Sequence, residues 1–165
     1  MLNIDKLLNI IQENYELNKP NGFENIKKVK YLNELDELRI PRNKILICGS
    51  ATLALYGLRD NKDLDVAVSK DMFKKLEKDK RFKRIFAGSG SKVLNYKNVD
   101  IHRNNWPFKN TVEDELKKSL IIDGYHFYSI YRLLEWKKKV NRDKDQKDAR
   151  MISKFIKDNN IDNRR

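Results

Sequence analysis

Apolar positions recur with helical spacing at both ends of the chain and fall into short runs in the middle. Residues 4–16 carry Ile, Leu and Tyr three or four positions apart, which predicts an amphipathic helix. Pro and Gly within 18–22 interrupt the pattern before a second predicted helix over about 23–37. The spacing is helical again from Ser129, the expected N-cap, which predicts one or two closing helices.

The middle of the chain shows the short apolar and alternating runs that are typical of strands. Strands are expected over 44–48, 63–68, 82–87, 92–96, 99–103, 120–122 and 125–128. Helices are expected over 51–56, closed by Gly57 as C-cap, and over about 70–80. Asp123-Gly124 predicts a hairpin turn, and we interpret Gly88–Ser91 as a turn rather than a phosphate-facing loop. This order of elements predicts an α+β fold.

A length of 165 residues suits one domain, since domains typically run to roughly 100–150 residues. We divide it into an N-terminal helical extension over 1–40, a core over 41–128 and C-terminal helices over 129–165. No internal repeat and no linker long enough to separate two domains is visible in the sequence.

Composition narrows the classes of function. Lys and Arg number 36 against 24 Asp and Glu, so the formal charge of +12 suggests a polyanionic partner. No run approaches the roughly 20 apolar residues of a membrane span, and acids within the first amphipathic segment argue against a signal peptide. Cys48 is the only cysteine, which excludes an internal disulfide and, with two histidines, disfavours a zinc site. We expect a cytoplasmic protein without a membrane partner, and its oligomeric state stays open.

Three acids stand in positions where chemistry is expected. Asp63 and Asp65 are two residues apart on a predicted strand, so both carboxylates point to one side, where their repulsion favours a divalent cation. Asp100 lies between apolar residues on a later predicted strand and could complete a two-metal site. The alternative is that the pair is solvated at a strand end and that Asp100 is an ordinary surface residue.

Gly49 and Ser50 connect a buried predicted strand to a predicted helix. Glycine permits close approach of a ligand to the backbone and Ser50 adds a hydroxyl, so the turn suits a phosphate. Read alone, it is also an ordinary connection. Cys48 just before it is interpreted as a small buried filler rather than a nucleophile.

Together, the segments ILICGSATLALYGLRDNKDLDVAV and VDIH resemble the nucleotidyltransferase superfamily, the fold of DNA polymerase beta, CCA-adding enzymes and small bacterial nucleotidyltransferases. The resemblance implies a mixed sheet flanked by helices and two Mg²⁺ ions, or Mn²⁺, held by Asp63, Asp65 and Asp100. It implies that Gly49 and Ser50 bind the triphosphate of a nucleotide. The usual second glycine of the turn is replaced by Cys48.

The C-terminal part, with the segment RDKDQKD, resembles the AbiEii-like and minimal nucleotidyltransferase groups. Carried over to this chain, the resemblance makes Lys137 and Lys144 candidates for contacting the triphosphate, with a solvated basic face as the alternative. Asp145 and Asp148 are expected to organise the start of the last helix, where acids complement the helix dipole.

The function implied is transfer of NMP from an NTP such as ATP to a hydroxyl of RNA or tRNA, a protein or a small molecule. Trp106, Tyr125, Tyr128 and Trp136 are candidates for stacking on RNA bases, or core residues. Two alternatives are a nucleotide phosphohydrolase with water as acceptor and a non-catalytic basic nucleic-acid-binding module. Some proteins of this fold are toxins or antitoxin partners, so a toxin–antitoxin or phage-related role also stays open.

Overall fold

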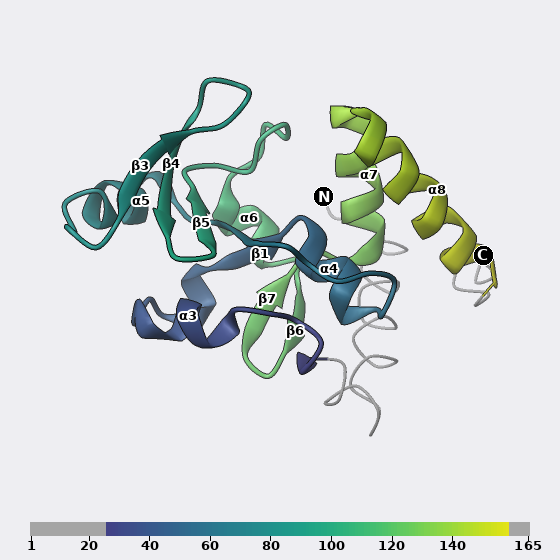
Figure 1. Ribbon diagram of the computed structural model, residues 1–165, viewed down its shortest axis with the longest axis horizontal. Helices are drawn as coiled ribbons and strands as arrows, with labels where there is room; N and C mark the ends of the chain where they lie inside the picture. The colour runs from purple at the N-terminus through teal and green to yellow at the C-terminus, as the bar shows by residue number, and fades with distance from the viewer. Residues whose placement is uncertain (1–25, 159–165) are drawn as a thin grey trace.

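The computed structural model describes residues 26–158, and the helix predicted over 4–16 lies outside them (Figure 1). A seven-stranded sheet in the order β3-β4-β5-β2-β1-β7-β6 forms the centre. Its strands are β1 (Leu46–Cys48), β2 (Leu64–Ala67), β3 (Lys83–Phe86), β4 (Lys92–Tyr96), β5 (Val99–His102), β6 (Leu120–Ile122) and β7 (Tyr125–Phe127). β2 pairs with β5 and β1 with β7 in parallel, and the other pairs are antiparallel, so the sheet is mixed.

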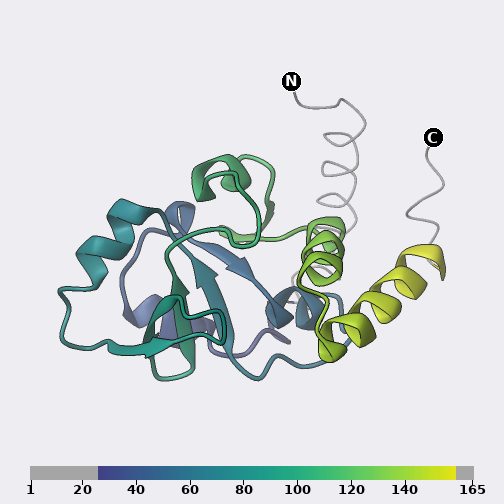
Figure 2. The ribbon, with the colours of Figure 1, turned by 90° about the horizontal axis from the view of Figure 1, so that it is seen from above.

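Helices flank this sheet, which confirms the predicted α+β class. They are α3 (Leu32–Glu37), the 3-10 turn η1 (Arg42–Lys44), α4 (Ser50–Leu55), α5 (Lys70–Leu76), α6 (Val112–Leu116), α7 (Ile130–Val140) and α8 (Asp143–Asp158). Figures 1 and 2 show α7 and α8 side by side at one end of the molecule and β3 at the other. None of the described helices has the length and apolar character needed to cross a membrane.

Alternation along the strands separates two apolar cores. Ile47 and Val66 belong to the core that also contains side chains of α3 and α5, such as Phe73. Their neighbours Leu46 and Ala67 point to the opposite face and pack with side chains of α6, α7 and α8. The α6–α8 group covers only part of its face, and the acidic residues lie on the part of that face beyond Ala67.

The helix predicted over about 23–37 is not continuous: Ile26 is helical, but residues 27–31 form turns and a bend. α3 begins only at Leu32, because Tyr31 has a left-handed backbone with φ of 74°. Asn61 stabilises this break: its Oδ1 accepts from the Lys30 N–H at 3.0 Å, and its Nδ2 donates to the Lys30 carbonyl at 3.2 Å. Leu35 is buried in the core, so this segment packs against the sheet.

Other boundaries follow local capping. α5 ends at Leu76 instead of continuing to about 80, and α6 was not expected, although Thr111 caps it by accepting from the Asp114 N–H. The predicted hairpin turn is confirmed, since Asp123 and Gly124 have φ of 50° and 75°. The turn at Gly88–Ser91 is confirmed as the connection between β3 and β4.

Candidate functional site

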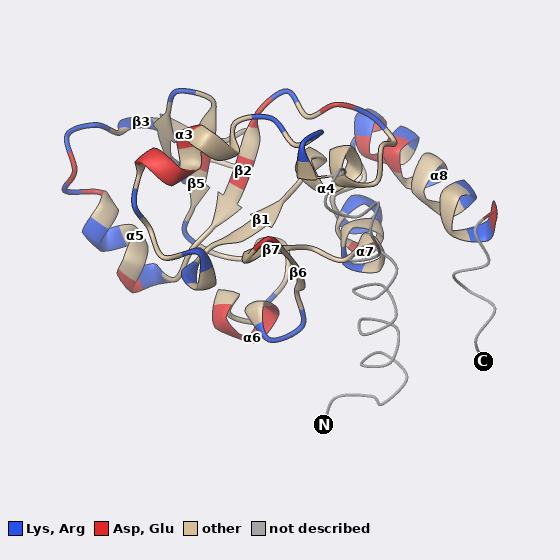
Figure 3. Cartoon of the chain, turned by 90° about the horizontal axis from the view of Figure 1, so that it is seen from below, with Lys and Arg blue, Asp and Glu red and all other residues tan. Residues whose placement is uncertain are grey.

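The strand register places two of the predicted acids side by side. Asp65 on β2 is the direct partner of Asp100 on the parallel neighbour β5, with Cys48 on its other side and Asn95 beyond Asp100. Direct partners point to the same face of a sheet, so these side chains form one row. Asp63 comes one residue before β2 rather than inside it. Figure 3 shows the acidic position of β2, coloured red, near the middle of the sheet.

The carboxylates of this row have specific partners. His102 Nε2 lies 2.9 Å from Asp65 Oδ1, and Asn95 Nδ2 donates to Asp100 Oδ1 at 2.7 Å. Burial and the nearby carboxylates of Asp65 and Asp100 raise the pKa of Asp63. Burial lowers the pKa of His102, but the hydrogen bond to Asp65 and the other acids outweigh it, so the pKa is raised. The acids therefore share one electrostatic environment.

His102 was not among the sequence-predicted site residues. It follows Asp100 by two positions in VDIH, so the period of a strand puts both on one face. That spacing is the signal that could have found it.

Gly49 brings the Gly-Ser turn against the acids. It precedes α4 with φ of 66° and ψ of −143°. A Cβ added at this position would lie 2.7 Å from Asp65 Oδ2, closer than real side chains approach. The turn needs glycine both for its conformation and for the contact with Asp65. Ser50, half-buried, starts α4 next to it.

The two candidate lysines, Lys137 and Lys144, lie in different environments. Lys144, exposed at the start of α8, is close enough to Asp63 for its charge to act against the rise in the pKa of that acid. Lys137 is 4% exposed, and its Nζ lies 3.1 Å from Asp145 Oδ1 and 2.8 Å from Asp148 Oδ2. The charge of Lys144 thus acts on Asp63 without a direct contact being present in the structure, whereas Lys137 is held by two carboxylates inside the α7–α8 contact.

Asp145 and Asp148 do more than start the last helix. Asp145 lies in the first turn of α8 as expected, and accepts from Arg142 Nε at 2.6 Å. Asp148 binds the Arg59 guanidinium, at 2.9 Å from Nε and 2.8 Å from the second nitrogen. Burial raises the pKa of both acids, but hydrogen bonds from Lys137 and the arginines outweigh it, so both pKa values are lowered. This buried network joins α7, α8 and the turn after α4.

Cys48 is half-buried with a free thiol whose Sγ donates to the Asp65 carbonyl at 3.5 Å. Burial raises the pKa of this thiol well above its usual value, so it stays protonated, in agreement with a filler role.

The four aromatic residues proposed for stacking separate into two pairs. Tyr125 and Tyr128 are 4% and 2% exposed, and their hydroxyls donate to Asp36 and Asn105. Trp106 is 49% exposed and meets Trp136 edge to face with ring centroids 6.4 Å apart. The tyrosines are therefore core residues, and an exposed ring is available only at Trp106 and in part at Trp136.

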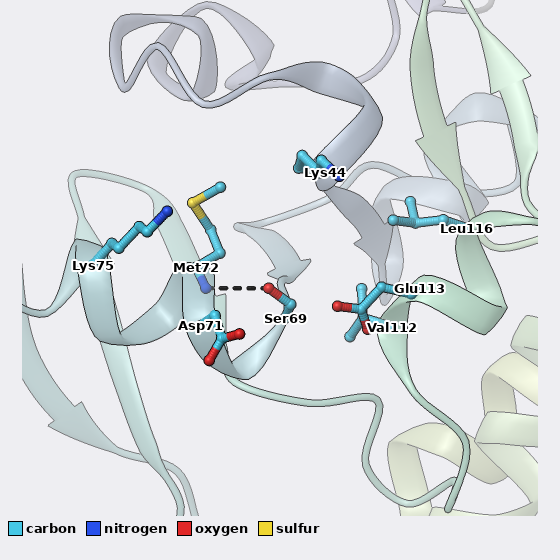
Figure 4. A pocket seen from close by; sticks show the side chains of 8 residues that line it. All are labelled: Lys44, Ser69, Asp71, Met72, Lys75, Val112, Glu113 and Leu116. Atoms are coloured by element: carbon cyan, nitrogen blue, oxygen red, sulfur yellow. Dashed lines mark hydrogen bonds between the residues drawn. The ribbon is translucent and has the colours of Figure 1, made fainter.

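A small pocket lies elsewhere, near the opposite end of β2. Figure 4 shows Ser69, Met72, Val112 and Glu113 among its lining residues. None of its lining residues belongs to the acidic row. Its volume of about 190 Å³ is also below the roughly 300–1,000 Å³ of small-molecule sites, so we do not regard it as the nucleotide site.

Within residues 26–158, no group of three or more His, Cys, Asp or Glu side chains is arranged so that it could hold a metal ion. In this arrangement Asp65 and Asp100 are engaged by His102 and Asn95. The chain matches no family model, and no curated protein or solved structure matches it. Its function therefore has to be argued from its own residues.

Proposed function

We propose that this protein is a metal-dependent nucleotidyltransferase that moves NMP from an NTP to a hydroxyl acceptor. The observation that carries the proposal is the pairing of Asp65 with Asp100 on neighbouring parallel strands, with Asp63 just before β2. The Gly-Ser turn packs against the same carboxylate row through Gly49. An acidic row and a close-approach turn are what binding a metal-bound phosphate requires.

The chemical type of these donors, although not their present arrangement, suits a hard divalent cation. Carboxylate oxygens are the ligands that Mg²⁺ and Mn²⁺ prefer, and Asp63, Asp65 and Asp100 would hold the ions. The raised pKa of Asp63 reflects burial and repulsion that a cation would relieve. When bound, the ions supply charge neutralisation of the phosphates and activation of the acceptor hydroxyl.

The remaining work falls to groups of the chain that position the nucleotide. Gly49 lets the backbone of the turn pack against Asp65, which puts the Ser50 hydroxyl next to the acidic row, where it donates to the triphosphate. Lys144 adds a positive charge on the Asp63 side. Lys137 acts indirectly, by holding Asp145 and Asp148 so that α8 presents Lys144. Catalysis of this kind is positioning and electrostatic stabilisation.

The test is transfer of label from [α-³²P]NTPs to RNA, protein and small hydroxyl compounds in Mg²⁺ or Mn²⁺. We expect Asp65→Asn and Asp100→Asn each to reduce transfer by at least about 100-fold, the scale of losing one electrostatic group. The matched control is Glu113→Gln, an exposed carboxylate on α6, which should transfer like the wild type.

Each other outcome has a definite meaning. Release of NMP or phosphate without any acceptor would assign the site to hydrolysis instead. Nucleotide binding without turnover would indicate a non-catalytic module. Full transfer by the folded Asp65→Asn and Asp100→Asn variants would contradict the proposal, and circular dichroism establishes that these variants are folded.

A further inference from the structure

The edge strand β3 has more exposed apolar surface than its position in the fold explains. All four of its residues are exposed, and Ile85 and Phe86 are 40% and 71% exposed. Within the described residues only Trp106 and Ile121 are comparable large exposed hydrophobic residues. These two adjacent side chains, one on each face of an open strand edge, make the edge a candidate binding surface.

The same segment concentrates positive charge. Residues 74–92 contain eight Lys and Arg against two acids, a net +6 out of the +12 of the whole chain. Both acids are already neutralised: Glu77 by Lys92 at 2.5 Å and Asp79 by Arg81 at 2.7 Å. In the part of the chain that the structure describes, Lys80 and Lys83 pair with no carboxylate. Figure 3 shows this basic segment around β3 and α5.

The register connects this edge to the acids. Lys83 is the direct partner of Asn95, which is in turn the partner of Asp100, so Lys83 points to the face that carries the acidic row. It lies two strands from Asp100, about 10 Å at the usual strand spacing. Ile85 is on the same face, whereas Phe86, one position further along β3, points to the opposite face at the open edge next to the Gly88–Ser91 turn. Lys83 and Ile85 thus connect the open edge to the acidic row, and Phe86 extends the exposed surface around that edge.

We propose that the β3 edge, defined as Lys80, Lys83, Ile85 and Phe86, binds single-stranded RNA and thereby selects RNA as the hydroxyl acceptor. Unpaired lysines and an exposed aromatic ring along one open strand edge fit a flexible single strand that wraps around the edge and offers both phosphates and unstacked bases. Double-stranded nucleic acid offers no free base face to Phe86, whereas single-stranded RNA supplies a stacking base and phosphates together. The acceptor role rests on the proposed function, whereas the binding itself does not.

Binding can be measured without chemistry, by fluorescence anisotropy of labelled single-stranded RNA in EDTA and without NTP. We expect Lys80→Glu/Lys83→Glu to weaken binding by about tenfold or more and to lower the salt-dependence slope by about 1.4, for two phosphate contacts. Phe86→Ala should weaken binding by about fivefold or more through lost stacking. The control, Lys154→Glu/Lys157→Glu, makes the same charge change on exposed residues of α8 at the other end of the molecule.

Three outcomes would overturn the proposal: no RNA binding by the wild type at low salt, equal losses in the α8 control, or unchanged binding by both folded edge variants. Equal affinity for polyglutamate with no effect of Phe86→Ala would reassign the edge to acidic proteins. Equal affinity for single-stranded DNA would overturn the selection of RNA.

Failure of this proposal is distinguishable from failure of the proposed function. Asp63→Asn should bind RNA at least as well as the wild type, because it removes a negative charge from the neighbouring face. If RNA binds at the edge but no acceptor of any kind is labelled, the transfer proposal fails while RNA binding at the edge stands. If another acceptor is labelled while the edge variants bind RNA normally, the edge proposal fails while the transfer proposal stands.

Discussion

At the residue scale, Gly49 controls how closely the Gly-Ser turn approaches Asp65. Its φ of 66° is a backbone conformation that side chains disfavour, and an added Cβ would meet Asp65 Oδ2 at 2.7 Å. We expect Gly49→Ala to lower the free energy of unfolding by about 1–3 kcal/mol and to weaken nucleotide binding. Urea denaturation and nucleotide titration measure both quantities.

Gly88→Ala is the matched control for this change. Gly88 lies in the turn between β3 and β4, and nothing lies within 4 Å of a Cβ added there. Its unfolding free energy should stay within about 0.5 kcal/mol of the wild type. If Gly49→Ala behaves like Gly88→Ala in both measurements, the close approach to Asp65 has no importance for the site.

Individual residues also show what spacing can predict. The two-residue period of strands suffices to put Asp100 on the face opposite Val99 and Ile101, which are buried in the core. It does not reveal burial in tertiary structure, so Lys137 and Lys144 look equivalent in sequence although only Lys137 is enclosed. Enclosure depends on the packing of α7 against α8, which local pattern does not encode.

At the element scale, the contact between α7 and α8 depends on one buried cation. Lys137→Met leaves Asp145 and Asp148 buried with Arg142 and Arg59 as their remaining charged partners. Losing one partner of a buried ion pair typically costs about 3–5 kcal/mol. Because the two arginines still neutralise the acids, we expect Lys137→Met to lower the free energy of unfolding by an amount near the lower end of this range. Chemical denaturation checks the value, and Lys138→Met on the exposed side of α7 should change it by less than about 0.5 kcal/mol.

The same network predicts acid sensitivity. The pKa values of Asp145 and Asp148 are lowered in the folded protein, so their contribution to stability is complete above the unfolded pKa of about 3.9. It is lost as the pH falls through the lowered folded values. We expect Asp148→Asn to be less stable than the wild type at pH 7, with a difference that shrinks below about pH 4.

Urea denaturation at several pH values measures this difference. Asp143→Asn, an exposed acid of the same helix, should show a difference that varies little with pH. A constant gap between wild type and Asp148→Asn down to pH 3 would show that the carboxylate charge is not what stabilises the contact.

Elements differ in how well their sequence specifies them. The β6–β7 hairpin was predictable because Asp123-Gly124 favours one turn type, and β4 matches its expected range of 92–96 because its ends are polar. The break before α3 was not predictable, because Asn61, 31 positions from Lys30, stabilises it. Local patterns therefore specify elements except where a distant side chain competes for the backbone.

At the scale of the whole molecule, charge is segregated. Half of the net positive charge lies within residues 74–92, while the acidic row lies at the centre of the sheet. With the opposite charges on different strands of one sheet, the row is available to a cation and the β3 edge to a polyanion. The overall charge of +12, which suggested a polyanion from the start, is thus compatible with a cation site in the same chain.

Binding of a cation at the acidic row can be tested by its effect on the thermal stability of the protein. A ligand that binds only the folded protein stabilises it by about 2.7 kcal/mol at 100 times its dissociation constant. For a chain of this length that corresponds to a rise of about 5 °C or more in melting temperature. Mg²⁺ or Mn²⁺ should therefore raise the melting temperature, measured by calorimetry against an EDTA sample, and Glu113→Gln should respond like the wild type.

The variant Asp63→Asn tests whether the cation binds at the acidic row. Because the pKa of Asp63 is raised in the fold, its ionised form at neutral pH disfavours the folded state, and an uncharged amide removes that cost. We expect the variant to match or exceed the wild-type melting temperature in EDTA and to lose most of the rise caused by the cation. A mutation that merely damaged the fold would lower the first value. An equal rise in variant and wild type would place the cation elsewhere, because repulsion among the acids of the row is what its binding is expected to relieve.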